Sequence, residues 1–318
     1  MKFIIRFSIF SILILSSLMA LVITVDPYSK LGNNPWGFKT KAVAQSRENK
    51  YILLENSKKE YKAFLLGSST AHRFSMKTLK ELTGLDSFNY SAQHTSPEDY
   101  IAMTKHILDR EKPELLLLEI GFIDMSENYK TDNRLFNSSL YKYLINAPKP
   151  DTLFDNNYFT LDAIRDSFRV IFVNKFGKAL HSNYLEDGNY KYEKPIPGPV
   201  KIEQSSYPDW KLSEKRVEIL KEINKICLDH KIKLIVFTAP LAYDHYLIAK
   251  RTEGYDTFIT TLTSIFPIVW NFHDESIKNY SSYKEFLNST HMTFEFSDTL
   301  LKRMLTGEPK DLGSLISK

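Results

Sequence analysis

The stretch Lys62-Ala-Phe-Leu-Leu-Gly-Ser-Ser-Thr70 decides the fold class of this chain of 318 residues. Its apolar run, residues 63–66, has the length of a β-strand and contains no polar residue. Such a run is typical of a strand that is buried on both faces of a sheet. Gly67 ends the run, and the small polar residues after it indicate a tight turn from the strand into a helix.

Segments of the same kind recur along the chain and alternate with helical patterns. The predicted strands are 62–67, 87–90, 114–120, 233–238 and 268–271. The predicted helices are 75–82, 96–110, 213–230, 252–266 and 294–305. Strands that alternate with helices are joined by right-handed crossovers, so we expect an α/β fold in which a parallel sheet carries helices on both faces.

The first residues of the chain have the pattern of a membrane anchor. Lys2 and Arg6 precede residues 7–25, which carry no charge, and Asp26 ends the run. A helix of this length spans about 28 Å, close to the thickness of a bilayer core. Because the run ends in Leu-Val-Ile-Thr-Val, without the small residues of a signal-peptidase site, we expect an uncleaved anchor and keep a cleaved signal as the alternative. The positive-inside rule places Lys2 and Arg6 in the cytoplasm and the rest of the chain outside it.

The alternation of strands and helices breaks off at residues 125–211, which are rich in Asn, Tyr, Asp and Pro. We interpret this segment as an insertion with a helix at 161–176, and not as a separate domain. The predicted organisation is therefore a membrane anchor at 1–25, a stalk and lead-in helix at 26–58, and an α/β domain at 59–318 that contains the insertion.

Composition excludes several classes of function. Lys and Arg number 42 against 38 Asp and Glu, a net charge of +4, and no basic run occurs, so we expect no nucleic-acid partner. The single cysteine, Cys227, excludes an intrachain disulfide and every Cys-rich zinc site. The loop histidines His94, His245 and His273 show no metal-ligand spacing. We therefore expect neither a metal nor another cofactor.

Polar residues follow the predicted strands at the points where they end, which is where open parallel sheets bind ligands. These residues are Ser69 and His72 after the first strand, Ser91 and Gln93 after the second, Asp124 after the third, and Asp274 and His291 after the last. A serine on a strand-to-helix turn, combined with polar donors and a distant histidine, is typical of a Ser-His hydrolase or acyltransferase.

Leu66-Gly-Ser-Ser-Thr70 resembles the first sequence block of the SGNH (GDSL-like) hydrolase superfamily. The chain is similar to the membrane-anchored bacterial branch, in which a signal anchor is followed by Val-Asp-Pro-Tyr (25–28 here), an Asn-x-Ser turn (89–91) and a late Asp-x-x-His. This branch includes relatives of the D-alanyl transfer protein of teichoic-acid synthesis and of alginate O-acetylation proteins. The resemblance covers the chain except for the insertion, and it implies a flavodoxin-like parallel sheet of about five strands.

The resemblance implies a role for each matching residue. Ser69 takes the position of the nucleophile, and its own N–H that of the first oxyanion donor. Ser91 matches the position of a second N–H donor, and His291 that of the general base. His72, in the first turn after Ser69, either lines the cleft or packs internally.

Two positions depart from the pattern of this superfamily. Ile123 stands where an oxyanion-binding Asn is usual, and Asn288 stands where the Asp of Asp-x-x-His is usual. In the Ser-His-Asp template the change from Asp to Asn costs about 10⁴ in kcat, and the loss of one oxyanion donor costs about 10²–10³. The missing acid can be replaced by the Asn288 carbonyl, or by Asp274 or Asp124 if either reaches the His291 ring. Gln93 can supply the missing N–H donor to the oxyanion.

From these residues and the resemblance we expect an extracytoplasmic O-acyl esterase or acyltransferase on the bacterial inner (cytoplasmic) membrane. Its expected substrate is a cell-envelope glycan or a glycan-linked acyl group. Its expected partners are the bilayer, through the N-terminal helix, and an envelope glycan or an acyl donor protein. Two alternatives stay open: a catalytically silent scaffold of the same fold for envelope polymer assembly, and a sugar-binding envelope module that uses the insertion.

Overall fold

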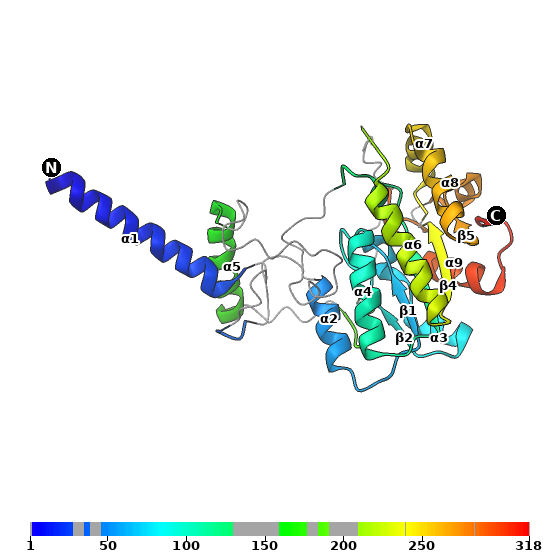
Figure 1. Ribbon diagram of the computed structural model, residues 1–318, viewed down its shortest axis with the longest axis horizontal. Coiled ribbons are helices and arrows are strands. Elements are labelled where there is room, and N and C mark those ends of the chain that lie inside the picture. The colour runs from blue at the N-terminus through cyan, green and yellow to red at the C-terminus, as the bar shows by residue number, and fades with distance from the viewer. Residues whose placement is uncertain are drawn as a thin grey trace.

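A computed structural model describes residues 2–27, 35–38, 46–129, 159–176, 184–190, 209–238, 240–282 and 284–317. Within these residues the chain is an α/β protein with a mostly parallel sheet, and an apolar helix precedes the sheet domain at the N-terminus (Figure 1). The α/β class predicted from the alternation of strands and helices is therefore confirmed.

The sheet is the frame of the molecule. Its described strands are β1 (Ala63–Leu66), β2 (Ser87–Asn89), β3 (Leu115–Glu119), β4 (Lys233–Thr238), β5 (Ile268–Asn271) and β6 (Ser314–Ser317). They lie in the order β2-β1-β3-β4-β5-β6, and only β6 runs antiparallel to its neighbour. The order of the five parallel strands, 2-1-3-4-5, is also that of flavodoxin-like sheets. The C-terminal β6 is an additional edge strand that the sequence analysis does not predict.

Helices cover both faces of the sheet. They are η1 (Ser69–Arg73), α3 (Met76–Thr83), α4 (Pro97–Arg110), α6 (Glu214–Asp229), α7 (Tyr243–Arg251), α8 (Tyr255–Ile265) and α9 (Phe294–Thr306). One layer contains α4, α6 and α8, which contact one another in that order, while α3 and α9 contact each other (Figure 1). Both faces of β1 and β3 are fully buried between these layers, as their uninterrupted apolar runs predict.

The register of the central strands positions the turn after β1. Leu66 at the end of β1 pairs with Leu118 of β3, so the residues that follow both strands meet at the same edge of the sheet. A side chain at Gly67 would place its Cβ 2.6 Å from the Glu119 Oε2 atom. Glycine is therefore required at this position, because the backbone of the turn passes directly over the Glu119 carboxylate.

The lead-in helix α2 (Ser46–Asn56) is part of the sheet domain. Arg47, on its first turn, donates to both carboxylate oxygens of Asp99 at 2.7 and 2.9 Å and to the carbonyls of Gln93 and His94 at 2.6 and 2.8 Å. Leu54 lies in the hydrophobic core. The helix is thus attached to the loop after β2, at the edge of the sheet where the candidate site lies.

The two ends of the insertion pair with each other at residues 126–127 and 211–212, which we call the neck of the insertion. Its first and last residues pair where Ser126 bridges Leu212 and where the Glu127 N–H donates to the Lys211 carbonyl at 2.8 Å. Its described helix, α5 (Leu161–Phe176), has the predicted bounds. This helix lies beside the C-terminal end of α1 (Lys2–Val25) (Figure 1). Among the residues described, α1 alone is long and apolar enough to span a membrane, a property that N-terminal signal sequences share.

Candidate active site

Two residues that lie far apart in sequence meet at the carboxyl edge of the sheet. Ser69 begins η1 directly after β1, and His291 lies in the loop that leads into α9. The Ser69 Oγ atom is 2.9 Å from the His291 Nε2 atom. This distance is within the range that general-base catalysis requires between a hydroxyl nucleophile and an imidazole.

Asn288 holds the opposite nitrogen of the imidazole. Its Oδ1 atom lies 3.0 Å from His291 Nδ1 and accepts the backbone N–H groups of Thr290 and His291 at 3.0 and 2.8 Å. These two N–H donors fix which end of the amide is oxygen. The Nδ1 atom is therefore the protonated one, and the Nε2 lone pair faces the Ser69 hydroxyl. The Thr290 Oγ1 atom, 3.2 Å from Nδ1, adds a second polar neighbour.

The two aspartates considered as substitutes for the usual carboxylate bind elsewhere. The Asp274 carboxylate caps a short helix by accepting the Ser276 N–H at 3.0 Å. The Asp124 carboxylate accepts the Gly121 N–H at 3.1 Å and the Tyr100 hydroxyl at 3.3 Å. The geometry thus favours Asn288, among the alternatives, as the group that orients the ring.

The backbone N–H group of Ser91, expected to help bind an oxyanion, is engaged in an internal hydrogen bond, and so is the backbone N–H group of Gln93. The Ser91 N–H donates to Asn89 Oδ1 at 3.1 Å, and this serine is fully buried. The Gln93 N–H donates to the hydroxyl of Ser46 on α2 at 2.9 Å. Both hydrogen bonds hold the loop after β2 in place.

Asn89 is a site residue that sequence reasoning treats only as part of a motif. Its buried amide donates to the carbonyls of Ala71 and Phe74 at 3.0 and 3.3 Å, so it clamps the η1 turn that presents Ser69. Its Oδ1 atom also accepts the Lys50 ammonium group at 3.0 Å. Its position at the end of a strand is the only signal in the sequence for this role.

A buried lysine and a buried histidine lie beside the Ser69–His291 pair. Burial lowers the pKa of Lys50 well below its ordinary value, although the negative charge of Asp187 opposes this shift, and its ammonium group makes hydrogen bonds with the Asn89 Oδ1 atom and the Ser91 hydroxyl. Burial also lowers the pKa of His72, with smaller contributions from the charges of Lys50 and His291. The Nε2 atom of His72 has no hydrogen-bond partner among the described residues.

The insertion supplies the aromatic residues that cover His72. The ring of Tyr190 stacks on the imidazole with the centroids 6.1 Å apart, and the ring of Tyr184 meets it edge-on at 5.9 Å. The Lys50 ammonium group lies 5.0 Å from the centre of the Tyr184 ring. Insertion and sheet domain therefore both contribute to this side of the site, and His72 packs internally.

Two buried acids lie beneath the Ser69 turn. The Oε2 atom of Glu119 accepts the Ser68 N–H at 2.6 Å. Burial raises the pKa of Glu119, and burial together with the charge of Glu119 raises the pKa of Asp124 from its ordinary 3.8 to about 8. Glu119 therefore supports the turn, and Asp124 binds the Gly121 N–H and the Tyr100 hydroxyl beside it.

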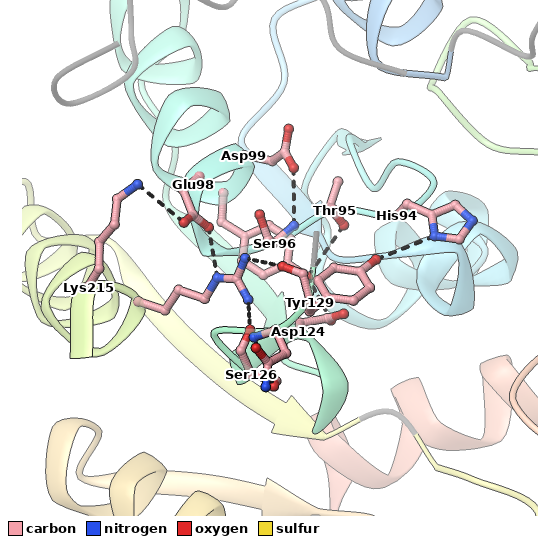
Figure 2. Close-up of polar contacts among 12 residues, drawn as sticks. His94, Thr95, Ser96, Glu98, Asp99, Asp124, Ser126, Tyr129 and Lys215 are labelled. Atoms are coloured by element: carbon pink, nitrogen blue, oxygen red, sulfur yellow. Dashed lines mark hydrogen bonds and ion pairs between the residues drawn. The ribbon is translucent and has the colours of Figure 1, made fainter. Parts of the chain in front are cut away.

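The first residues of the insertion pack against the loop after β2. Figure 2 shows Asp124, Ser126 and Tyr129 beside residues His94 to Asp99, with the Tyr129 hydroxyl 3.5 Å from His94 Nδ1. Glu98 forms an ion pair with Arg216 at 3.1 Å, and Arg216 also donates to the carbonyls of Ser126 and Tyr129. These contacts lock the neck of the insertion to the edge of the sheet that carries the site.

Within the described residues, no three His, Cys, Asp or Glu side chains form a group that could hold a metal ion. No protein-family model matches this chain, and no curated protein matches it. The chemistry of the site is therefore inferred from the Ser69–His291–Asn288 arrangement, in which a hydroxyl, a base and a group that orients the base lie in line.

Proposed function

We propose that this protein is a membrane-anchored serine esterase or acyltransferase of the SGNH type that acts on an acyl group of a cell-envelope glycan. The observation that carries the proposal is the 2.9 Å distance between Ser69 Oγ and His291 Nε2, with Asn288 behind the ring. The position of Ser69 directly after β1 and the 2-1-3-4-5 order of the parallel strands support the SGNH assignment.

The proposed reaction has two half-reactions. The Ser69 oxygen attacks the acyl carbonyl while His291 Nε2 takes the hydroxyl proton, and the Ser69 N–H stabilises the oxyanion. The tetrahedral intermediate then breaks the bond to the leaving alcohol, which receives the proton from His291. The acyl group remains on Ser69 as an ester. Water, in an esterase, or a glycan hydroxyl, in a transferase, then attacks this ester with His291 as base and regenerates Ser69.

Asn288 limits the rate that this arrangement can reach. Its carbonyl selects the reactive tautomer of His291 by accepting the Nδ1–H. An amide carries no charge, so it stabilises the imidazolium of the transition state less than a carboxylate does. We therefore propose a slow acyl-transfer catalyst that acts on a substrate presented at high local concentration.

Membrane anchoring is the second part of the proposal. We propose that α1 crosses the bacterial inner membrane once, with Lys2 and Arg6 in the cytoplasm and the α/β domain outside. The exposed apolar surface of α1 and its lack of charge after Arg6 support this topology. An envelope glycan or an acyl donor protein on the outer side would then be the partner.

Labelling with a fluorophosphonate probe tests the nucleophile. Full-length protein in detergent micelles is expected to incorporate the probe at Ser69, as mapped by peptide mass spectrometry, and to release acetate from p-nitrophenyl acetate. Ser69→Ala is expected to lose both activities. Ser68→Ala is the matched control, because the Ser68 hydroxyl contacts Thr70 and not His291, and it is expected to keep both.

A catalytically silent scaffold is the second candidate function. It is favoured by Asn288 and Ile123, which replace the two side chains that usually orient the base and bind the oxyanion. Folded wild-type protein that neither binds the probe nor hydrolyses the ester would support the scaffold and contradict the enzyme. Labelling that persists unchanged in Ser69→Ala would show that the nucleophile is another residue.

A further inference from the structure

Helix α5 of the insertion presents a stripe of large apolar side chains to its surroundings. Leu161, Phe168, Phe172 and Phe176 are 85%, 55%, 63% and 67% exposed. Their spacing of seven, four and four residues places them on one face of the helix. The rings of Phe172 and Phe176 contact each other at 5.2 Å, so the stripe is continuous at its C-terminal end.

The opposite face of α5 packs against the protein. Its buried residues are Ala163, Asp166, Ser167 and Val170. Helix α5 contacts α1, and the buried residues of α1, Val22 and Val25, lie in its last turn (Figure 1). Between Phe3 and Leu15, α1 exposes ten large apolar side chains, as expected of a segment that faces lipid. The apolar stripe of α5 therefore lies at the end of α1 that leads into the sheet domain.

We infer that α5 lies in the interface of the lipid bilayer, with its apolar stripe inserted among the headgroups where α1 leaves the membrane. This inference rests on the anchoring proposed for α1. Because the bilayer already surrounds α1, it is the apolar phase nearest to the stripe. A surface helix that packs one face on the protein and exposes aromatic and basic side chains on the other resembles an interfacial amphipathic helix.

The charges of α5 suit the same position. Arg169 and Lys175 are exposed at the sides of the stripe, and Arg165, which lies on the stripe between Leu161 and Phe168, forms an ion pair with Asp162 at 2.9 Å. The Lys175 ammonium group lies 5.3 Å from the centre of the Phe176 ring. Long basic side chains can extend from beside an inserted aromatic face to the headgroup phosphates, and anionic lipids favour them.

Binding of α5 to the membrane surface would hold the active site close to the membrane. Phe176 at the end of α5 is only eight positions before Tyr184 in the sequence, and the ring of Tyr184 contacts His72 beside the proposed catalytic pair. Eight residues reach at most about 28 Å when fully extended. The acyl group that Ser69 would attack is therefore expected at the surface of the bilayer, and not deep in the cell wall.

Fluorescence quenching of labelled cysteine variants tests the inference. In a Cys227→Ala background, Phe172→Cys carries an environment-sensitive fluorophore, and Leu161→Cys is a second labelled position on the stripe. Leu228→Cys on α6 is the matched control, since Leu228 is an apolar residue that is 70% exposed on the sheet domain. The full chain is reconstituted in nanodiscs of phosphatidylethanolamine and phosphatidylglycerol, with and without nitroxide-labelled lipid.

Labels at 172 and 161 are expected to be quenched by the nitroxide lipid and shielded several-fold from aqueous iodide, whereas the label at 228 shows the reverse. Equal iodide quenching at 172, 161 and 228 would overturn the inference. Shielding from iodide without quenching by the lipid would also overturn it, because a protein partner or a second copy would then cover the stripe. A chain that does not co-elute with nanodiscs would overturn both the anchoring and this inference, without affecting the test of Ser69 acylation.

Discussion

At the scale of single residues, the proposed chemistry depends on one amide. Asn288 occupies the position of an acid, yet its carbonyl makes the hydrogen bond to His291 that an acid would make. Two backbone N–H groups hold that carbonyl in place, so a neutral amide orients the ring. Orientation of the base and stabilisation of its charge are thus separable in this site.

Replacement of Asn288 by Asp tests this separation. The carboxylate has the shape of the amide and can accept the same three hydrogen bonds, and it adds a charge beside the imidazolium. We expect Asn288→Asp to raise kcat for p-nitrophenyl acetate by at least about tenfold, because a carboxylate stabilises the imidazolium of the transition state and a neutral amide does not. Asn288→Ala is expected to lower kcat below wild type. A fall in kcat with Asp would show that Asn288 does not act through His291.

Other residues of the site have no signal in the sequence. Lys50 belongs to the lead-in helix, and its sequence context is that of a solvent-exposed lysine. In the structure it is fully buried between Asn89 and Tyr184. Glu119 is the last residue of an apolar strand, yet it accepts the Ser68 N–H. Both roles arise from packing between segments that are distant along the chain.

At the scale of elements, local signals predict helix boundaries well. Ser96, Pro97 and Asp99 predict a helix start, and α4 begins at Pro97 with the Asp99 carboxylate accepting the Ser96 N–H at 3.1 Å. By contrast, α7 and β6 are not predicted. The helical pattern at 252–266 corresponds to α8 alone. Strand β6, at the edge of the sheet, alternates between exposed and half-buried residues.

The attachment of α2 gives a prediction at this scale. The Arg47–Asp99 ion pair is buried, so Arg47→Ala leaves the Asp99 carboxylate without its cation. We expect a loss of about 3–5 kcal/mol in the free energy of unfolding, measured by chemical denaturation in detergent micelles. Lys59→Ala, which breaks an exposed pair with Glu186, is the control and is expected to change stability little. Similar losses of stability in both variants would show that Arg47 does not attach α2 to the sheet domain.

At the scale of the whole molecule, the acids buried beneath the active site link stability to pH. The pKa of Asp124 is about 8 in the folded protein, against an ordinary 3.8. Between these values the folded state keeps a proton that the unfolded chain releases, so stability falls as pH rises through this range. The lowered pKa values of Lys50 and His72 have the opposite effect, since the unfolded chain binds the extra protons there.

A comparison with Asp124→Asn isolates the contribution of this acid. The amide oxygen can still accept the Gly121 N–H and the Tyr100 hydroxyl, but it does not titrate. Between about pH 5 and about pH 8 we expect the melting temperature of wild type to fall relative to that of the variant, since one retained proton is worth up to about 1.4 kcal/mol per pH unit. Equal pH dependence in both proteins would show that Asp124 is already ionised when folded.

The sequence by itself determined the α/β class, the buried strands and the residues that meet at the carboxyl edge of the sheet. These properties follow from short-range patterns, such as an apolar run that ends in Gly67 or a cap at Ser96. Only the tertiary structure decided that Asn288 orients His291, that the N–H groups of Ser91 and Gln93 serve internal hydrogen bonds, and that α5 lies beside α1. The physical reason is that hydrogen-bond partners and burial depend on which distant segments pack together, and short-range sequence patterns do not predict that packing.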